Sequence, residues 1–264
     1  MRAGGNLVPT ILYEDSDVLV LDKPSGLVVN RAASVREKFT LMDWLATEWG
    51  ERLGSKVGSG RKEDEKMSEF EMRCGVVHRL DKDTSGIMVT AKNERAFISL
   101  QGQFKDRSVV KEYVALSHIY SWDFSKDKDL SRFAVDAPIG RNPKNRMKWA
   151  VVKGGRSAVT EFEVLSTYSL PSGGTGLFLR CIPRSGRTHQ IRVHLTALNL
   201  PVVCDKIYLS RRMYALDSAW CPRLFLHAKT LSFKHPVNGE MLQFECGLPK
   251  ELQRVLVHLD SESK

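Results

Sequence analysis

Residues 75–91 of this chain have the sequence GVVHRLDKDTSGIMVTA. Short apolar runs at the two ends of this stretch, GVV and IMVTA, predict two strands that a charged turn connects. The turn presents the carboxylate of Asp81 between two cations, Arg79 and Lys82. Charged side chains that a rigid scaffold presents on a loop are a frequent arrangement for functional groups. The alternative is a polar turn in which Asp81 and Asp83 hydrogen-bond their own backbone.

Hydrophobic periodicity along the rest of the chain predicts its secondary structure. Alternating patterns predict strands at 109–116, 157–165 and 176–183, and short apolar runs next to turn residues predict strands at 11–15, 17–22, 27–29, 224–233 and 241–246. Helical spacing predicts helices at 40–46, 93–106, 188–198 and 249–257, with Thr40 and Thr188 as N-caps. The polar, glycine-spotted segment 50–72 is predicted to be a mobile loop or insertion.

Strands outnumber helices in this pattern, and hairpins outnumber βαβ units. We therefore expect an α+β fold in which residues 1–264 form a single domain. Its centre would be a mixed, largely antiparallel β-sheet flanked by helices and loops.

The composition is that of a globular protein, with 264 residues of which 42% are hydrophobic and 27% charged. No apolar stretch is long enough to span a bilayer, so we expect no membrane association. The five cysteines are scattered without a CxxC pair, which argues for a reducing compartment and against disulfides or a zinc site. We expect a cytoplasmic protein, or alternatively a mitochondrial one in processed form.

Basic residues exceed acidic ones and give the chain a net charge of +9, which favours a polyanionic partner. The cations include three clusters: Arg141, Lys144, Arg146, Lys148, Lys153 and Arg156; then Arg180, Arg184, Arg187 and Arg192; then Arg211, Arg212 and Arg223. Few acids lie among them, which favours a groove that follows a nucleic-acid backbone over a merely solvated basic surface.

Two long motifs resemble those of one enzyme family. The run 77–92, VHRLDKDTSGIMVTAK, closely resembles the signature of the RluA-type pseudouridine synthases, which isomerise uridine within RNA. The string GRTHQIRVH at 186–194 resembles a second motif of that family. The resemblance extends over about 11–252. It implies a single pseudouridine synthase catalytic domain without a separate S4-like RNA-binding domain.

Two shorter elements resemble the same family with one departure each. In the opening segment the family has an asparagine before the Lys-Pro pair, where this chain has Asp22. Residues 205–208 match a Gly-Asp-x-x-Tyr element, but Cys204 replaces the usual glycine.

The resemblance implies roles for four side chains. Asp81 would be the catalytic nucleophile, and Arg79 would help to displace the target base. Arg192 would pair with Asp81, and Tyr113 would pack on the flipped uracil near the proton on C5. From the residues alone, an Arg192 that contacts solvent or RNA phosphate and a Tyr113 packed in a strand core are the simpler alternatives.

We expect the RNA to contact a further group of basic residues around this centre. The candidate RNA-binding residues are Arg79, Lys82, Arg141, Lys144, Arg146, Lys148, Arg187 and His189. His189 and His194 are five residues apart and do not share a helix face, so we expect no metal site. No cofactor motif is present in the sequence, and the isomerisation requires no cofactor in principle.

The expected activity is isomerisation of uridine to pseudouridine in a structured RNA, ribosomal or transfer, by base flipping and attack by Asp81 at C6 or C1′. Partners would be RNA and a pre-ribosomal particle, and we expect a monomer when free. A non-catalytic RNA-binding or ribosome-assembly factor on the same scaffold is the alternative. A metal-dependent nuclease is disfavoured, because no third acidic group accompanies Asp81 and Asp83.

Overall fold

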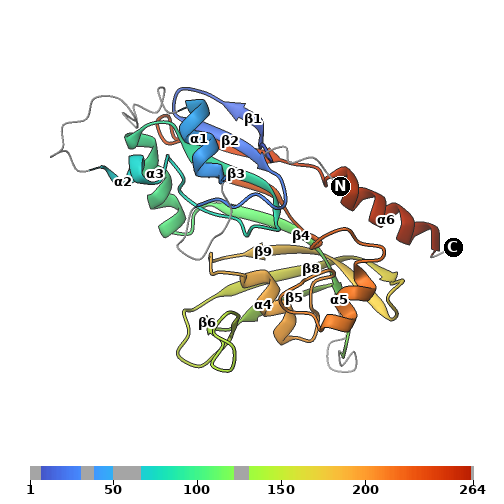
Figure 1. Cartoon of the computed structure of the whole chain (residues 1–264). Coiled ribbons are helices and arrows are strands. Elements are labelled where there is room, and N and C mark those ends of the chain that lie inside the picture. The colour runs from blue at the N-terminus through green and yellow to red at the C-terminus, as the bar shows by residue number, and fades with distance from the viewer. Residues whose placement is uncertain (1–6, 31–38, 50–66, 122–130, 263–264) are drawn as a thin grey trace. The chain divides into compact units, whose positions relative to one another are not determined.

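The computed structural model describes residues 7–30, 39–49, 67–121 and 131–262 (Figure 1). The chain divides into two compact units, which we describe separately. Unit 1 comprises Met1–Val109 and Leu231–Cys246, and unit 2 comprises Val110–Thr230 and Gly247–Lys264. The single domain expected over residues 1–264 stays a prediction.

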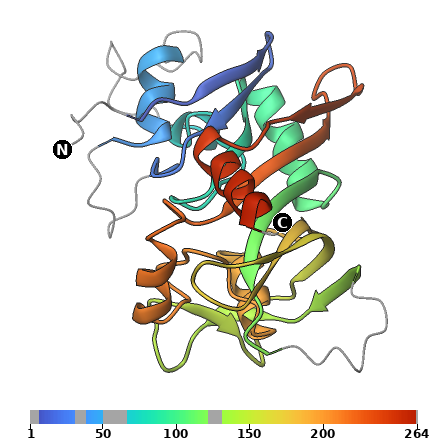
Figure 2. The ribbon, with the colours of Figure 1, turned by 90° about the vertical axis from the view of Figure 1, so that its right-hand side faces the viewer.

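Unit 1 contains strands in the order β1-β2-β3-β10, with β11 paired to β10. The strands β1 (Thr10–Glu14) and β2 (Val18–Lys23) form the predicted first hairpin. β2 pairs antiparallel with β3 (Ser85–Ala91), in which every residue is buried. The predicted closing hairpin is formed by β10 (Leu226–Lys234) and β11 (Met241–Glu245), drawn in orange and red in Figure 2.

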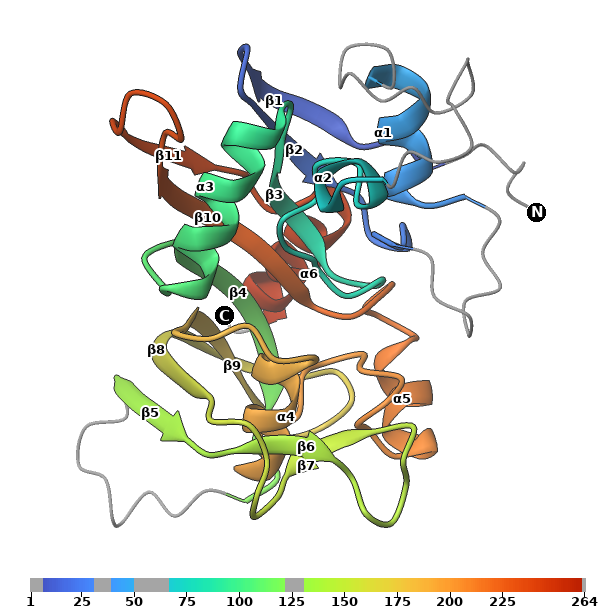
Figure 3. The same ribbon diagram turned by 90° about the vertical axis from the view of Figure 1, so that its left-hand side faces the viewer.

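Two predicted helices of unit 1 are confirmed. α1 (Leu41–Trp49) follows Thr40, whose hydroxyl accepts the amide hydrogen of Asp43 at 3.3 Å. α3 (Glu94–Lys105) begins after Asn93, whose side chain accepts the amide hydrogen of the third helical residue. Figure 3 shows α3 lying across one face of β3. It buries Ala96, Phe97 and Leu100.

The strand predicted at 27–29 is wrong. The carbonyl oxygens of Val28 and Val29 accept the amide hydrogens of Leu41 and Met42, at 2.8 and 3.1 Å. These carbonyls therefore satisfy the first amides of α1, which a helix cannot satisfy itself, instead of joining a sheet.

The prediction of a loop at 50–72 is wrong for its last residues, which form a short helix. Residues 50–66 lie outside the described residues. Beyond them, α2 (Glu69–Met72) is helical and begins with a capping box, in which Ser68 and Glu71 each accept the other's backbone amide hydrogen.

The first residues of β10, 226–230, belong to unit 2, whose strands follow the order β10-β4-β9-β8-β5. The long hairpin of β8 (Val159–Ser169) and β9 (Thr175–Pro183) is as predicted. β4 (Val110–His118) pairs with β9, and β5 (Arg132–Asp136) pairs with β8. The sequence analysis missed β5 and the separate two-stranded hairpin of β6 (Ile139–Arg141) and β7 (Trp149–Val151).

Three helices belong to unit 2: α4 (Gln190–Ala197), α5 (Arg211–Asp217) and α6 (Lys250–Glu262). The predicted cap of α4 is wrong. The N-cap is His189, not Thr188, and it adopts a left-handed φ of 57° without a side-chain capping bond. Figure 3 shows α4 next to the β6–β7 hairpin.

Buried apolar side chains form two main clusters in unit 2. In the first, Ile191 and Leu195 of α4 pack against Leu179 of β9. In the second, Leu252 and Val255 of α6 pack with residues of β4 and the neighbouring loops. The clusters fix α4 and α6 against the sheet by burial of apolar surface.

The α+β class is confirmed: the described residues contain eleven strands and six helices, and the pairings β1–β2, β2–β3, β4–β9, β5–β8, β6–β7 and β8–β9 are antiparallel. All five cysteines are free thiols. None of the helices in the described parts of the chain has the length and apolar character needed to cross a membrane.

Candidate active site

The turn that carries Asp81 in unit 1 begins after buried Leu80 and ends at the start of β3. The carbonyl of Asp81 accepts the amide hydrogen of Thr84 at 3.2 Å, which closes the turn. Asp81 itself is half-buried, whereas Arg79 and Lys82 on either side are exposed. The burial of Leu80 therefore fixes the backbone next to the carboxylate and leaves the flanking cations accessible.

The loop after β2 holds this turn in place through Lys23, whose side chain is fully buried. Its Nζ donates to the carbonyl oxygens of Pro24, Leu27 and Lys82, at 2.8, 2.9 and 3.2 Å. The amide of Gly26 donates to the same Lys82 oxygen at 2.8 Å. Because a buried ammonium group must be hydrogen-bonded, these contacts fix the backbone directly after Asp81.

His78, at the start of the motif, supports the turn from the other side. Its Nε2 accepts the amide hydrogen of Val89 on β3 at 3.0 Å. Its ring stacks on Phe104 of α3, with the centroids 4.5 Å apart. The hydrogen bond requires a neutral ring with the proton on Nδ1, so His78 fixes the motif to β3 and α3.

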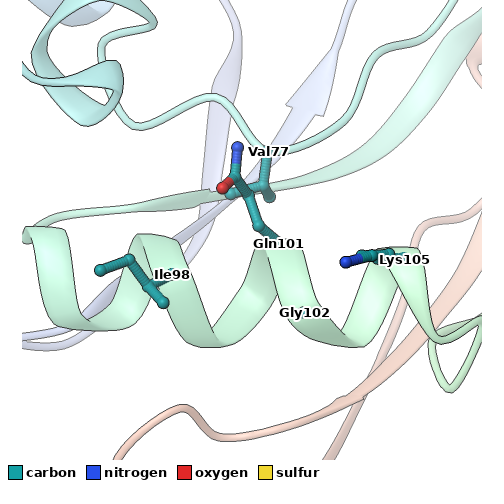
Figure 4. Close-up of a pocket in the computed structure, with 5 residues that line it drawn as sticks. All are labelled: Val77, Ile98, Gln101, Gly102 and Lys105. Carbon is teal, nitrogen blue, oxygen red and sulfur yellow. The ribbon is translucent and has the colours of Figure 1, made fainter.

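A pocket of about 470 Å³ lies next to this motif on α3 (Figure 4). It is lined by Val77, Ile98, Gln101, Gly102 and Lys105. Its walls provide one cation and no nucleophile or carboxylate, so the lining residues offer no catalytic pair.

In unit 2, Arg192 lies on α4 and only 3% of it is exposed. Its Nε and Nη2 donate to Oδ2 and Oδ1 of Asp205 at 2.7 and 2.8 Å. Oδ1 of Asp205 also accepts the amide hydrogens of Ile207 and Tyr208, at 2.9 and 3.1 Å. This buried bidentate pair excludes an Arg192 that faces solvent on the helix surface. The expected pairing of Arg192 with Asp81 stays a prediction.

Tyr208 contacts several of the candidate residues at once. Its ring centroid lies 5.2 Å from Cζ of Arg192 and 5.9 Å from Nζ of Lys148. Its hydroxyl accepts the amide hydrogen of Trp149 at 3.2 Å and lies 3.0 Å from Nδ1 of His189. One phenol therefore contacts the buried guanidinium, the N-cap of α4 and the start of β7.

Tyr113 lies on β4, opposite Cys181 of β9, and packs partly buried against the first apolar cluster of unit 2. This placement agrees with the simpler alternative, a tyrosine that packs against the core of the sheet. The role of Tyr113 next to a uracil ring stays a prediction.

The β6–β7 hairpin carries four of the predicted RNA-binding residues, which we call the cationic hairpin: Arg141, Lys144, Arg146 and Lys148. Cζ of Arg141 lies 4.4 Å from the centroid of the Trp149 ring, and its Nη1 donates to the carbonyl of Arg146 at 3.1 Å. Met147 between two of the cations is 83% exposed. Within the described residues, no carboxylate forms an ion pair with these four cations.

The second predicted cationic cluster does not form a groove of accessible charges, because two of its arginines form ion pairs with glutamates. Arg180 pairs with Glu163 at 2.6 Å, and Arg184 pairs with Glu161 at 2.7 Å. These pairs could not be predicted from the sequence, because the acids lie on β8 and the bases on or directly after β9, about twenty residues apart. Of this cluster, Arg187 is half-buried and donates from Nε to a backbone carbonyl oxygen.

Three residues of the candidate site escaped prediction: Lys23, Asp205 and Tyr208. The Asp-x-x-Tyr spacing was visible in the sequence. The role of Asp205 as the counter-charge of Arg192, however, depends on a contact between residues that are thirteen positions apart. Cys204, which replaces the family's usual glycine, has a φ of 59°, in the left-handed region that glycine tolerates best.

Comparison with known proteins identifies the family. A family model described as RNA pseudouridylate synthase matches residues 17–197, well over half of the chain. The chain belongs to this family. The resemblance to the RluA-type enzymes is thereby confirmed, and the protein is an RNA pseudouridine synthase, an isomerase.

Individual relatives agree with this assignment. "Ribosomal large subunit pseudouridine synthase D" of Xanthomonas campestris is 36% identical over 261 residues, covering 96% of this chain and 70% of the relative. The RNA pseudouridine synthase YlyB of Bacillus subtilis is 35% identical over 250 residues, covering 94% of this chain and 72% of the relative. The solved structure of Human RNA Pseudouridylate Synthase Domain Containing 1 shares the fold, with a TM-score of 0.65 at 24% identity, covering 99% of this chain and 98% of that chain.

Proposed function

We propose that this enzyme converts uridine to pseudouridine in large-subunit ribosomal RNA, with Asp81 as the nucleophile. The name of the Xanthomonas relative, a ribosomal large subunit pseudouridine synthase, supports the substrate class. The observation that carries the role of Asp81 is its position: a half-buried carboxylate on a turn that buried Lys23 anchors, between exposed Arg79 and Lys82.

The chemistry needs a nucleophile, a rotation and a proton transfer. The target uridine is flipped out of the RNA, and the Asp81 carboxylate attacks C6 of the ring or C1′ of the sugar. The N1–C1′ bond breaks, the uracil rotates, and a C5–C1′ bond forms. The bond that Asp81 formed to C6 or C1′ breaks, which returns the free carboxylate. C5 loses its proton to solvent and N1 gains one, so substrate and product are isomers and no oxidant or donor is consumed.

Other residues bind the RNA and position the target uracil in this proposal. Tyr113 packs on the uracil, and Arg192 supplies positive charge for the nucleophilic carboxylate. The cationic hairpin, with Arg187 and His189, binds the RNA backbone. We expect Arg192→Ala to reduce turnover at least as much as any substitution in the cationic hairpin.

The test uses RNA labelled with tritium at C5 of uridine and isolated from cells that lack this protein, since each isomerisation releases one C5 hydrogen. Asp81→Asn should reduce tritium release by roughly a thousandfold or more while RNA binding persists. Asp83→Asn is the matched control, because Asp83 lies two residues away on the same turn and is exposed. Normal turnover by the Asp81 variant would refute the nucleophile assignment.

The same assay decides the substrate. Release from ribosomal RNA supports the proposal, and release from transfer RNA alone contradicts it. Binding without release from either RNA by the unmodified chain would favour the non-catalytic assembly factor. We further propose that the enzyme acts as a monomer on a pre-ribosomal particle, which sedimentation of the free and the particle-bound protein would test.

A further inference from the structure

We propose that Tyr208 is a positioning residue that holds Arg192 in register with the cationic hairpin, so that RNA bound by the hairpin meets a correctly placed guanidinium. The inference rests on the proposed function in one respect, namely that Arg192 assists the reaction and the hairpin binds RNA. All the contacts that carry it lie within unit 2.

The first set of contacts fixes Tyr208 to the hairpin. Its hydroxyl accepts the amide hydrogen of Trp149, the first residue of β7, at 3.2 Å. The ring of that tryptophan carries the Arg141 guanidinium, and Nζ of Lys148 lies over the Tyr208 ring. Tyr208 therefore contacts the cationic hairpin at two neighbouring residues, Lys148 and Trp149.

The second set fixes Tyr208 to the Arg192–Asp205 pair. The phenol ring lies against the guanidinium, with 5.2 Å between its centroid and Cζ. The backbone amide of Tyr208 donates to Oδ1 of Asp205, the same oxygen that accepts from Nη2 of Arg192. A shift of Tyr208 would therefore disturb Arg192 both directly and through its carboxylate partner.

The third contact reaches the start of α4. The hydroxyl of Tyr208 lies 3.0 Å from Nδ1 of His189, and the rings meet edge to face at 5.7 Å. The carbonyl of His189 accepts the amide hydrogen of Val193 at 2.8 Å in the first turn of α4. Arg192 lies in that turn, so Tyr208 also fixes the helix end from which Arg192 projects.

The apolar core between the hairpin and α4 is small. It consists of three buried residues, Ile139, Ala158 and Val193, and receives Trp149 and Tyr208 on its surface. To this small core Tyr208 adds the hydrogen bonds and ring contacts that connect the hairpin with Arg192.

The test separates positioning from RNA affinity. Tyr208→Phe removes the hydroxyl and should reduce kcat about fivefold, the typical effect of one hydrogen bond. Tyr208→Leu also removes the ring and should reduce kcat by about tenfold or more. The Kd for ribosomal RNA, measured in an Asp81→Asn background to prevent turnover, should stay within about twofold, because the hairpin cations remain. Tyr214→Phe, at a tyrosine packed on the other core cluster, is the control and should leave both constants unchanged.

A double-mutant comparison makes the inference refutable on its own. Because Tyr208 acts through Arg192, adding Tyr208→Leu to Arg192→Ala should lower kcat no further than Arg192→Ala alone. An equal loss of kcat in both backgrounds, or a loss of RNA affinity that accounts for the whole effect, would overturn the positioning role. Full turnover by Arg192→Ala would instead contradict the proposed function. Urea unfolding of each variant shows whether the losses arise from folding.

Discussion

The ammonium group of Lys23 donates a hydrogen bond to the carbonyl oxygen of Lys82, 59 residues later in the chain. The same ammonium group also donates to the carbonyl oxygens of Pro24 and Leu27. A buried cation thus links the end of β2 directly to the turn that carries Asp81.

Lys23→Met should therefore destabilise the protein and impair turnover. The carbonyl oxygens of Pro24 and Leu27 would lose a donor, at a cost of about 1–3 kcal/mol for each group left unsatisfied, whereas that of Lys82 would keep the amide of Gly26. Urea unfolding measures the loss, and tritium release measures the effect on the turn. Lys105→Met, at an exposed lysine of α3, is the control and should change the free energy of unfolding by less than about 0.5 kcal/mol. Equal stability of the two variants would show that Lys23 is not an anchor.

Asp205→Asn should be among the most destabilising single substitutions in unit 2. It would leave the buried guanidinium of Arg192 without its counter-charge, which costs about 3–5 kcal/mol for a buried pair. Glu161→Gln breaks the pair with Arg184, in which both side chains are more than 40% exposed, and should cost about 0.2–1 kcal/mol. Chemical denaturation of both variants provides the comparison, and similar losses would mean that Arg192 finds another partner.

The cationic hairpin should account for a measurable part of the salt dependence of RNA binding. Lys144→Ala or Arg146→Ala should weaken binding and reduce the slope of log Kd against log salt by about 0.7–0.9 for each phosphate that the side chain neutralises. Arg184→Ala should leave the slope unchanged, because Glu161 already neutralises that guanidinium. Binding titrations at several salt concentrations test this difference. A slope that responds equally to all three changes would place the RNA elsewhere on unit 2.

His194 should make folding stability depend on pH below neutrality. Burial lowers the pKa of this imidazole, although the Nε2 hydrogen bond to the carbonyl of Ala137 and the charge of Asp136 act in the opposite direction. The unfolded chain then binds the proton more readily than the folded protein. The stabilisation is therefore complete above the unfolded pKa of about 6.5 and is lost as the pH falls below it.

His194→Gln should flatten the fall in unfolding free energy between about pH 7 and 5, because it removes the titrating group. The glutamine can still donate to Ala137. His258→Gln, at an exposed histidine of α6, is the matched control and should retain the full pH dependence. If both variants behave like the unsubstituted protein, another group is responsible for any acid sensitivity.

The sequence predicted the elements whose periodicity is long and regular. The hairpin of β8 and β9 shows alternating apolar residues, the hairpins of β1 and β2 and of β10 and β11 show apolar runs on either side of turn residues, and the helix α3 has a four-residue apolar stripe with Asn93 as its cap. The three-residue strands β6 and β7 are too short to show a period.

The caps and counter-charges were harder to predict because they depend on tertiary contacts. Thr188 is a better N-cap residue than His189 by propensity. In the structure, however, His189 contacts Tyr208 and has a left-handed backbone conformation, and the helix begins one residue later than predicted. The partner of Arg192 could not be deduced by counting acids nearby in the sequence, since Asp205 belongs to the loop after α4.

The ion pairs across β5, β8 and β9 have a consequence for encounter with RNA. Arg132 and Arg180 both pair with Glu163, and Arg184 pairs with Glu161, so two of these three positive charges are neutralised over this sheet. The four hairpin cations, which form no ion pair within the described residues, therefore contribute more to the positive field at the β6–β7 end than the paired arginines contribute over the sheet. Long-range attraction would turn a diffusing polyanion toward that end before contact, which raises the association rate more than the lifetime of the complex.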